Sequence, residues 1–517
     1  MTTRREALAG LAAAPLFVPG LARATAGDPV ATTRYGRVRG LREAGVLVFR
    51  GVRYGADTAP HRFARALPPA PWTSVVDATR YGASAAQTGA DGPGREDCLF
   101  LNVWTPALDG GRRPVMVYLH GGAHSHGSGS DPLYDGGNLV RRGDVVVVTL
   151  NHRLAGLGYA YLARLGGPAE SGNVGNLDIV LALQWVRDNI AAFGGDPGRV
   201  MLFGQSGGGA KVVTLMAMAQ ARPLFHAAAT MSGQHVTAAG PNNATKRAQA
   251  WMRKAGAADF TELARLPVEG LVAALAMTDP LEGKGEISFT STLDHGVLAR
   301  HPFYPDAPRE AAHIPLIVGN THDETGYWLE KTLKAGDTTW DNLPARLGRE
   351  IVKDVDPVWL IGEYRKLYPE RSPGQILLAA STAARSWPGH LIQAEERAKI
   401  GAPTWMYQLD FPAPEASGVL GAFHTLDIGL VFANTNLASA RTGDGPEAQR
   451  LAGQMADAFI RLARSGDPNG GDLPNWPKFD LNRRATMIFD RSARVEGDPR
   501  RAERLLLAVA PYIKPGG

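Results

Sequence analysis

The sequence places a serine between two glycines in the pentapeptide Gly204-Gln205-Ser206-Gly207-Gly208. An apolar run precedes this pentapeptide and a stretch of small residues follows it, which is typical of a sharp turn from a strand into a helix. Glycine suits the flanking positions because side chains there would collide in such a turn. The pattern predicts that Ser206 is a nucleophile exposed at a helix N-terminus. Because the chain has 61 glycines, the pentapeptide alone does not establish this chemistry.

A serine hydroxyl is a poor nucleophile at neutral pH, so it needs a base, a carboxylate that orients the base, and donors for the oxyanion. The segment His120-Gly121-Gly122-Ala123 follows an apolar run and has small residues after its histidine. Small residues let backbone N–H groups turn toward a substrate carbonyl oxygen, so this segment is the expected oxyanion loop. It also fits a plain glycine-rich turn after a strand.

The acid and the base are expected downstream of the serine, in the order acid and then histidine. Asp323-Glu324 and His424 each follow an apolar run, at the strand ends where parallel sheets carry function. The chain has 13 histidines, and spacing alone does not separate His424 from His390 or His322.

Buried strands and amphipathic helices alternate along the chain. The helical spacing of Ile179, Leu183 and Val186 places an apolar stripe on one face of residues 178–190. This alternation predicts an α/β fold with a large, mostly parallel sheet flanked by helices. The Gly-, Pro- and Asp-rich residues 194–198 and 465–477 predict turns or loops. Apolar runs predict strands at residues 115–119, 145–150, 200–203, 314–318 and 404–409, and helical insertions around the site are expected at residues 238–309 and 327–402.

The 517 residues, 44% of them hydrophobic, are enough for a large buried core, and we expect one domain over residues 27–517. The net charge of +5 is small for this length, and Lys and Arg form no basic stripe. Nucleic acid is therefore not an expected partner. No apolar run is long enough to predict a membrane span, so stable membrane insertion is not expected either.

Residues 1–26 have the pattern of an export signal. Thr3-Arg4-Arg5 precedes an apolar stretch over residues 7–18, and small-residue cleavage sites follow within residues 22–26. The paired arginines favour the twin-arginine route and an exported, periplasmic or secreted protein. An ordinary signal or an Arg-containing helix fits the same residues. Cys98 is the only cysteine, so no internal disulfide can form, which suits export after folding in the cytoplasm.

Neither a metal nor a cofactor is expected. His124-Ser125-His126 lies beside the expected oxyanion loop, but no carboxylate or third histidine follows at ligand spacing. Residues 204–211 differ from a phosphate-binding loop because Ala210 replaces the glycine before the lysine.

The segment Glu96-Asp97-Cys98-Leu99-Phe100-Leu101-Asn102-Val103 resembles a signature of the type-B carboxylesterase/lipase family, which includes cholinesterases and neuroligin adhesion proteins. The similarity extends from about Thr33 to Trp476-Pro477 and implies the α/β-hydrolase fold. Further matching stretches lie at residues 62–63, 172–175, 182–186, 189–190, 193–197 and 466–469.

The resemblance implies a role for each matching residue. Ser206 would be the nucleophile, Glu324 the acid and His424 the base. The oxyanion donors would be the backbone N–H groups of Gly122, Ala123 and Gly207. Ser232 and Asp427 fall where the family places polar residues that support the triad.

The chain departs from the family pattern at several of these positions. Gln205 replaces the usual glutamate, which removes a negative charge and should bias His424 less toward its charged form. Gly207 replaces the usual alanine. The glycine that usually follows the acid directly comes one residue later, at Gly326, which leaves Asp323 as the alternative acid. Cys98 stands where relatives form a disulfide, but residues 81–95 contain no partner.

The resemblance implies a carboxylic ester hydrolase that forms an acyl-enzyme and acts on small-molecule esters. The same triad fits an amide or carbamate hydrolase, and the family also contains non-catalytic adhesion proteins. Residues 82–95 lack the aromatic ring that holds the ammonium of choline in cholinesterases, so a choline ester is not expected. Aromatic residues of the second insertion fit either pocket walls or core packing: Tyr327, Trp328, Trp340, Trp359 and Trp387. The sequence sets neither the preferred ester nor the oligomeric state.

Overall fold

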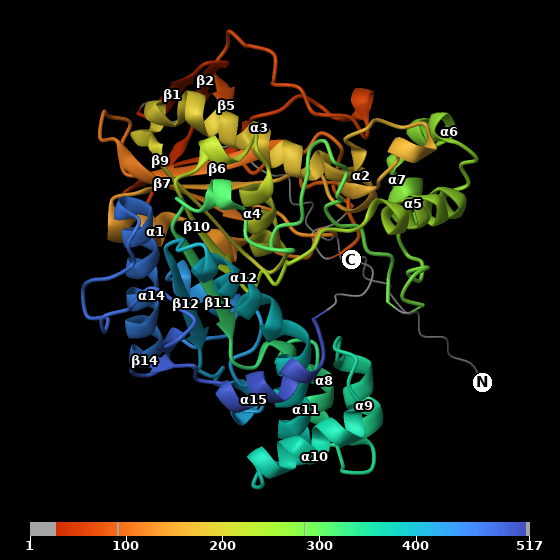
Figure 1. The fold of residues 1–517 in the computed structure, drawn as a ribbon. Coiled ribbons are helices and arrows are strands. Elements are labelled where there is room, and N and C mark those ends of the chain that lie inside the picture. The colour runs from red at the N-terminus through yellow and green to blue at the C-terminus, as the bar shows by residue number, and fades with distance from the viewer. Residues whose placement is uncertain (1–26, 90–92, 284, 513–517) are drawn as a thin grey trace, which may run out of the picture.

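An 11-stranded sheet forms the centre of the computed structural model, which describes residues 27–89, 93–283 and 285–512 (Figure 1). The export signal expected at residues 1–26 lies outside the described residues. The strand order is β14-β13-β12-β11-β10-β9-β7-β8-β6-β4-β3. The pairs from β8 through β7, β9, β10, β11 and β12 to β13 are parallel, whereas both margins of the sheet are antiparallel.

The strands of this sheet are β3 (Leu41–Glu43), β4 (Val46–Arg53), β6 (Phe100–Thr105), β7 (Arg113–Leu119), β8 (Val146–Leu150), β9 (Gly195–Gln205), β10 (Ala227–Met231), β11 (Leu316–Thr321), β12 (Thr404–Leu409), β13 (Ala485–Phe489) and β14 (Arg494–Gly497). A smaller sheet contains β1 (Val30–Thr33), β2 (Gly36–Arg39) and β5 (Val76–Asp77).

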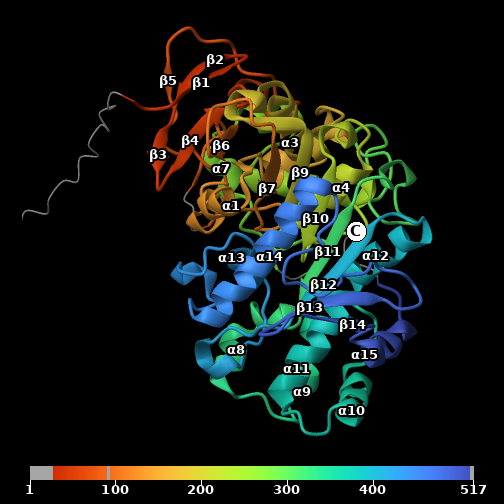
Figure 2. The ribbon, with the colours of Figure 1, turned by 90° about the vertical axis from the view of Figure 1, so that its left-hand side faces the viewer.

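Helices cover both faces of the large sheet. On one face lie α1 (Gly137–Gly143), α13 (Leu426–Val431) and α14 (Pro446–Ser465), and Figure 2 shows α14 in front of the central strands. On the other face lie α3 (Val174–Asn189), α4 (Gly207–Ala217) and α12 (Trp387–Lys399). Among the described residues, no helix is both long enough and apolar enough to cross a bilayer.

Two further groups of helices come from the predicted insertions and lie apart from each other in Figure 1. The first contains α5 (Pro241–Ala255), α6 (Phe260–Arg265) and α7 (Val268–Ala273). The second contains α8 (Glu330–Ala335), α9 (Leu343–Glu350), α10 (Pro357–Leu367) and α11 (Pro373–Ser381), and a π-helical turn over Thr382–Ser386 joins α11 to α12. The remaining helices are α2 (Ala155–Tyr159) and α15 (Arg501–Leu506).

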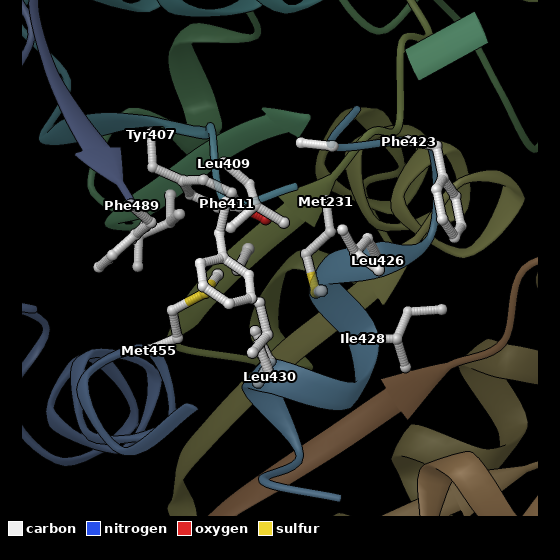
Figure 3. Packing of buried hydrophobic residues seen from close by; sticks show 14 of the residues in the cluster. Met231, Tyr407, Leu409, Phe411, Phe423, Leu426, Ile428, Leu430, Met455 and Phe489 are labelled. Atoms are coloured by element: carbon white, nitrogen blue, oxygen red, sulfur yellow. The ribbon is translucent and has the colours of Figure 1, made fainter. Parts of the chain in front are cut away.

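The alternation of side chains along each strand divides the core between the two faces. Met116 and Tyr118 of β7 pack toward α14, whereas Val115, Val117 and Leu119 pack toward α3 and α4. Figure 3 shows part of the apolar cluster on the face of the sheet that α14 covers, where side chains of β10, β12, α13 and α14 gather. Because every central strand is covered on both faces, its residues form continuous apolar runs, as expected for a parallel sheet.

All five predicted strands occur, with small shifts at their ends. Residues 194–198, predicted as a turn or loop, include a turn at Gly194 and the start of β9 at Gly195. The strand is irregular here, because its pairing with β7 shifts from Arg113–Gly195 to Val115–Val200 and the Gly198 N–H donates to the Asp196 side chain at 2.9 Å. The local preference of Gly, Asp and Pro for turns therefore appears as an irregularity within the strand. The predicted helix at residues 178–190 is confirmed as α3, which starts four residues earlier at Val174.

Gly319 tests the packing of β11 against β12, and Gly362, which lies in open space, is its control. Gly319 pairs with Tyr407, and a Cβ atom at Gly319 would fall on the Tyr407 ring. We expect Gly319→Ala to destabilise the protein by about 3 kcal/mol, since the ring must move. Gly362 lies in α10 with no heavy atom within 4 Å of such a Cβ, so Gly362→Ala should stabilise the protein by about 0.5 to 1 kcal/mol. Chemical denaturation of both variants measures these changes, and equal effects would contradict the packing.

Candidate active site

Ser206 occupies a sharp turn between β9 and α4. Its backbone has φ 55° and ψ −122°, a conformation that costs free energy for a residue with a side chain. The turn is held in place because the Ser206 N–H donates to the Met231 carbonyl of β10 at 2.7 Å, and the Ser206 carbonyl accepts from the Ala210 N–H at 2.9 Å. Ser206 is partly exposed, whereas the residues on both sides of it are buried.

The glycines around Ser206 are required by close backbone contacts. A Cβ at Gly204 would lie 2.6 Å from the carbonyl carbon of Gly208, and a Cβ at Gly208 would collide with the carbonyl oxygen of Leu119 in β7. A Cβ at Gly207 would collide with the backbone of Ala123. The predicted steric reason for the two flanking glycines is confirmed, and the departure from alanine at position 207 has a steric reason as well.

His424 and Glu324 form a buried pair beside this turn. His424 Nδ1 lies 2.5 Å from Glu324 Oε2. The other carboxylate oxygen, Oε1, accepts from the Ser232 hydroxyl at 2.6 Å and from the Thr321 N–H at 3.0 Å. Burial disfavours the charged form of Glu324, but the pKa of this carboxyl is lowered because His424 and the hydrogen bonds to it outweigh burial. Glu324 is therefore ionised and can orient the imidazole.

The other residues that spacing left as alternatives have different partners. Asp323 Oδ1 lies 2.9 Å from His322 Nδ1, and its Oδ2 accepts from the Ala422 N–H at 3.0 Å. His390 is buried in α12, and burial lowers its pKa to about 4. Among the candidates, Glu324 is thus the carboxylate that contacts His424.

The second ring nitrogen of His424 faces the amide of Gln205. Gln205 Nε2 lies 3.3 Å from His424 Nε2, so the amide donates and the ring nitrogen accepts. This places the ring proton on Nδ1, toward Glu324, which leaves Nε2 as the basic atom. The Trp328 ring lies over the same imidazole, with ring centroids 4.8 Å apart. Both contacts restrict the orientation of the imidazole.

The predicted oxyanion loop lies against the turn. Gly122 and Ala123 are both left-handed, with φ of 81° and 53°. A Cβ at Gly121 would lie 3.5 Å from the Cβ of Ser206, so the loop closely approaches the serine. Within the part of the chain that the structure describes, the N–H groups of Gly122, Ala123 and Gly207 donate to no protein acceptor. They are available to a substrate oxygen.

Ser206 and His424 line one cavity of about 580 Å³, together with Ala123 and Gly207. Both insertions contribute to its wall, as predicted. Of the aromatic residues considered above, Trp328 lines the cavity, whereas Trp387 is buried in the core and Trp340 and Trp359 are exposed. The wall also has a polar part that no sequence pattern indicates, and it includes Glu282, Arg349, Glu350 and Arg385.

The two supporting positions differ in what they contact. Ser232 hydrogen-bonds Glu324 directly, whereas Asp427 Oδ2 accepts from the Tyr407 hydroxyl at 2.7 Å. Among the described residues, no group of three or more His, Cys, Asp or Glu side chains could hold a metal ion. Cys98 is buried, and burial raises the pKa of its thiol.

A sharp serine turn after a central parallel strand, with the acid and the histidine after later strands, defines an α/β hydrolase. Residues 27–505 match the model of the carboxylesterase family. The chain is 34% identical to the para-nitrobenzyl esterase of Bacillus subtilis, covering 92% of this chain and 97% of that protein. It is 33% identical to the phenmedipham hydrolase of Pseudarthrobacter oxydans, over 92% and 98%.

A solved structure of a carboxylesterase from Geobacillus stearothermophilus is 35% identical and superposes with a TM-score of 0.81, covering 92% of this chain and 99% of that one. The protein therefore belongs to the carboxylesterase family and is a carboxylic ester hydrolase with the α/β-hydrolase fold. Esterases of this family act on small-molecule esters.

Asp427 gives the site a measurable dependence of stability on pH. Burial raises the pKa of this carboxyl from 3.8 to about 6, although the hydrogen bond from Tyr407 opposes the shift. Between these two values the unfolded chain loses its proton while the folded protein keeps it, so stability falls as pH rises. Above about pH 6 the loss is complete.

Asp427→Asn removes this titration but keeps an acceptor for Tyr407. We expect the free energy of unfolding of the variant, relative to the wild type, to be about 1 kcal/mol higher at pH 8 than at pH 5. Chemical denaturation at both pH values measures the difference. A difference of zero or of opposite sign would show that Asp427 is charged throughout this range in the folded protein.

Proposed function

We propose that the protein cleaves carboxylic esters through an acyl-enzyme on Ser206, with His424 as the base and Glu324 as the acid of the triad. The contact between His424 and Glu324 carries the proposal, because it leaves Nε2 as an acceptor in a ring that shares a cavity with Ser206. In this mechanism, Nε2 takes the proton of the Ser206 hydroxyl as its oxygen attacks the ester carbonyl.

The charge that develops on the carbonyl oxygen is stabilised by the N–H groups of Gly122, Ala123 and Gly207. The imidazolium formed on His424 then gives its proton to the departing alcohol, and the acyl group stays on Ser206. Water attacks this acyl-enzyme with the same histidine as base and releases the carboxylic acid. Throughout the cycle Glu324 holds the proton on Nδ1 and stabilises the imidazolium, helped by the donors Ser232 and Thr321.

Two substitutions test these roles. Ser206→Ala should lower kcat on a nitrophenyl ester by about 10⁴-fold or more and abolish labelling by a fluorophosphonate. Glu324→Gln should lower kcat by about 10³- to 10⁴-fold, because it removes the charge that orients and stabilises the histidine.

Asp323→Asn is the matched control for Glu324, since the adjacent carboxylate contacts His322 and its asparagine can still accept from Ala422. We expect this variant to keep most of the activity. The triad would be wrongly assigned if Ser206→Ala stayed active, or if the control lost more activity than Glu324→Gln.

We also propose that residues 1–26 direct export by the twin-arginine route. The support is the sequence pattern of Thr3-Arg4-Arg5 before the apolar residues 7–18, and the match to the family model starts directly after this segment. Replacing Arg4 and Arg5 by lysine in the full chain should leave the enzyme in the cytoplasm of a bacterial host, whereas the wild type is exported. Esterase activity in the separated fractions measures this. Equal export of both proteins would instead indicate an ordinary signal.

A further inference from the structure

Lys211 is a buried lysine beside the serine turn, and the mechanism above does not use it. It lies in α4 with none of its surface exposed, and Nζ donates to the Ala123 carbonyl oxygen at 2.7 Å. Burial lowers its pKa to about 7, and among the described residues no carboxylate contributes to that shift. Burying a charge without a counter-ion destabilises a protein, so a lysine at this position needs a physical reason.

The neighbouring titratable groups provide no opposite charge. His120, after β7, and His152, after β8, stack with ring centroids 5.0 Å apart, and the Nδ1 of each ring faces a backbone carbonyl. Burial first and the charge of Lys211 second lower the pKa of both rings, to about 3 for His120. Both rings are therefore neutral at pH 7, and the oxyanion loop carbonyl is the acceptor that Lys211 has.

Lys211 lies on the same face of α4 as Gly207, because residues four apart in a helix lie one above the other. Gly207 is in contact with the backbone of Ala123, since a Cβ at this glycine would collide with the Ala123 carbonyl group and Cα. Lys211 then bonds the carbonyl oxygen of the same residue. One face of α4 thus contacts Ala123 twice, through the backbone of Gly207 and through the hydrogen bond from Lys211. These contacts hold Ala123 in a left-handed conformation that is unfavourable for a residue with a side chain.

Ala123 separates Lys211 from the substrate. Ala123 and Gly207 line the cavity, whereas Lys211 lies behind them and is not among its described lining residues. We propose that Lys211 is a positioning residue: its amino group fixes the oxyanion loop through the hydrogen bond to the carbonyl of Ala123 and so holds the loop N–H groups ready for the oxyanion. This inference rests on the proposed acyl-enzyme mechanism and adds a residue to it.

Oxyanion donors work only when they are held in position before charge develops. With a pKa of about 7, Lys211 is partly protonated at neutral pH, and its amino group can donate to Ala123 in either form. In the protonated form the bond is charge-assisted and stronger than one from a neutral donor, and a dry environment strengthens it further. A displacement of the donors by about 1 Å costs roughly 100-fold in rate. A space-filling role would be met as well by methionine, which has a similar volume and no charge to bury.

Lys211→Met separates these two roles. We expect the variant to fold with a Tm equal to or above that of the wild type, since it removes an uncompensated charge. Its kcat on a nitrophenyl ester should fall by about 10- to 100-fold with KM changed less than about twofold. Affinity for an aryl trifluoromethyl ketone, which forms a tetrahedral oxyanion on the serine, should fall by the same factor as kcat.

Lys353→Met is the matched control, because Lys353 is also buried and its ammonium also donates to backbone carbonyls, those of Leu507 and Ala510. We expect it to leave the ratio of inhibitor to substrate affinity unchanged. Lys211→Gln, which keeps a shorter neutral donor, should fall between methionine and the wild type in kcat. If Lys211→Met does not fold, the comparison of Lys211→Gln with the wild type tests the inference.

A folded Lys211→Met or Lys211→Gln with wild-type kcat and inhibitor affinity would overturn the inference. An equal loss of kcat and inhibitor affinity in Lys211→Met and Lys353→Met would also overturn the inference, because the effect would then come from the loss of any buried hydrogen bond. Ser206→Ala is measured in parallel. If that variant remains active, the acyl-enzyme mechanism itself fails, whereas an inactive Ser206→Ala with unaffected Lys211 variants refutes the positioning role alone.

Discussion

The close contact between the serine turn and the end of β7 is the constraint on which the rest of the site depends. Ser206 has a left-handed backbone, and Gly208 lies so close to the Leu119 carbonyl that any side chain would collide with it. Because β7 and β9 are neighbours in the sheet, the loop after β7 must pass beside the serine. The backbone contact thus brings donors and nucleophile together before any substrate is present.

The carboxylate and the histidine are held by a second set of contacts further along the sheet. Glu324 follows β11 and contacts His424 after β12, and these two strands are parallel neighbours. Their spacing depends on Gly319, which leaves room for the Tyr407 ring. Tyr407 in turn reaches Asp427, three residues beyond the histidine. Packing between two strands therefore determines where the acid and the base of the site lie.

The charges around the site differ from those implied by the family pattern. Gln205 contributes a neutral amide that donates to His424, in place of a carboxylate. On the opposite side of the serine turn, Lys211 is buried against Ala123, and the adjacent rings of His120 and His152 are neutral. Because Gln205 is neutral, one carboxylate fewer than the family pattern implies lies beside the reacting carbonyl, which favours the negative charge that forms in ester cleavage.

Three features could be predicted without the folded structure: the serine turn with its glycines, the five apolar strands, and the order of nucleophile, acid and base. The turn and the strands follow from local sterics and from the periodicity of apolar residues, whereas the order of the triad follows from the family resemblance. The choice between Glu324 and Asp323 required the folded structure, because adjacent side chains point in different directions and contact different histidines. The folded structure also decided that β9 starts at Gly195 and that Lys211 bonds Ala123, since both depend on residues more than 80 positions apart that only the folded sheet brings together.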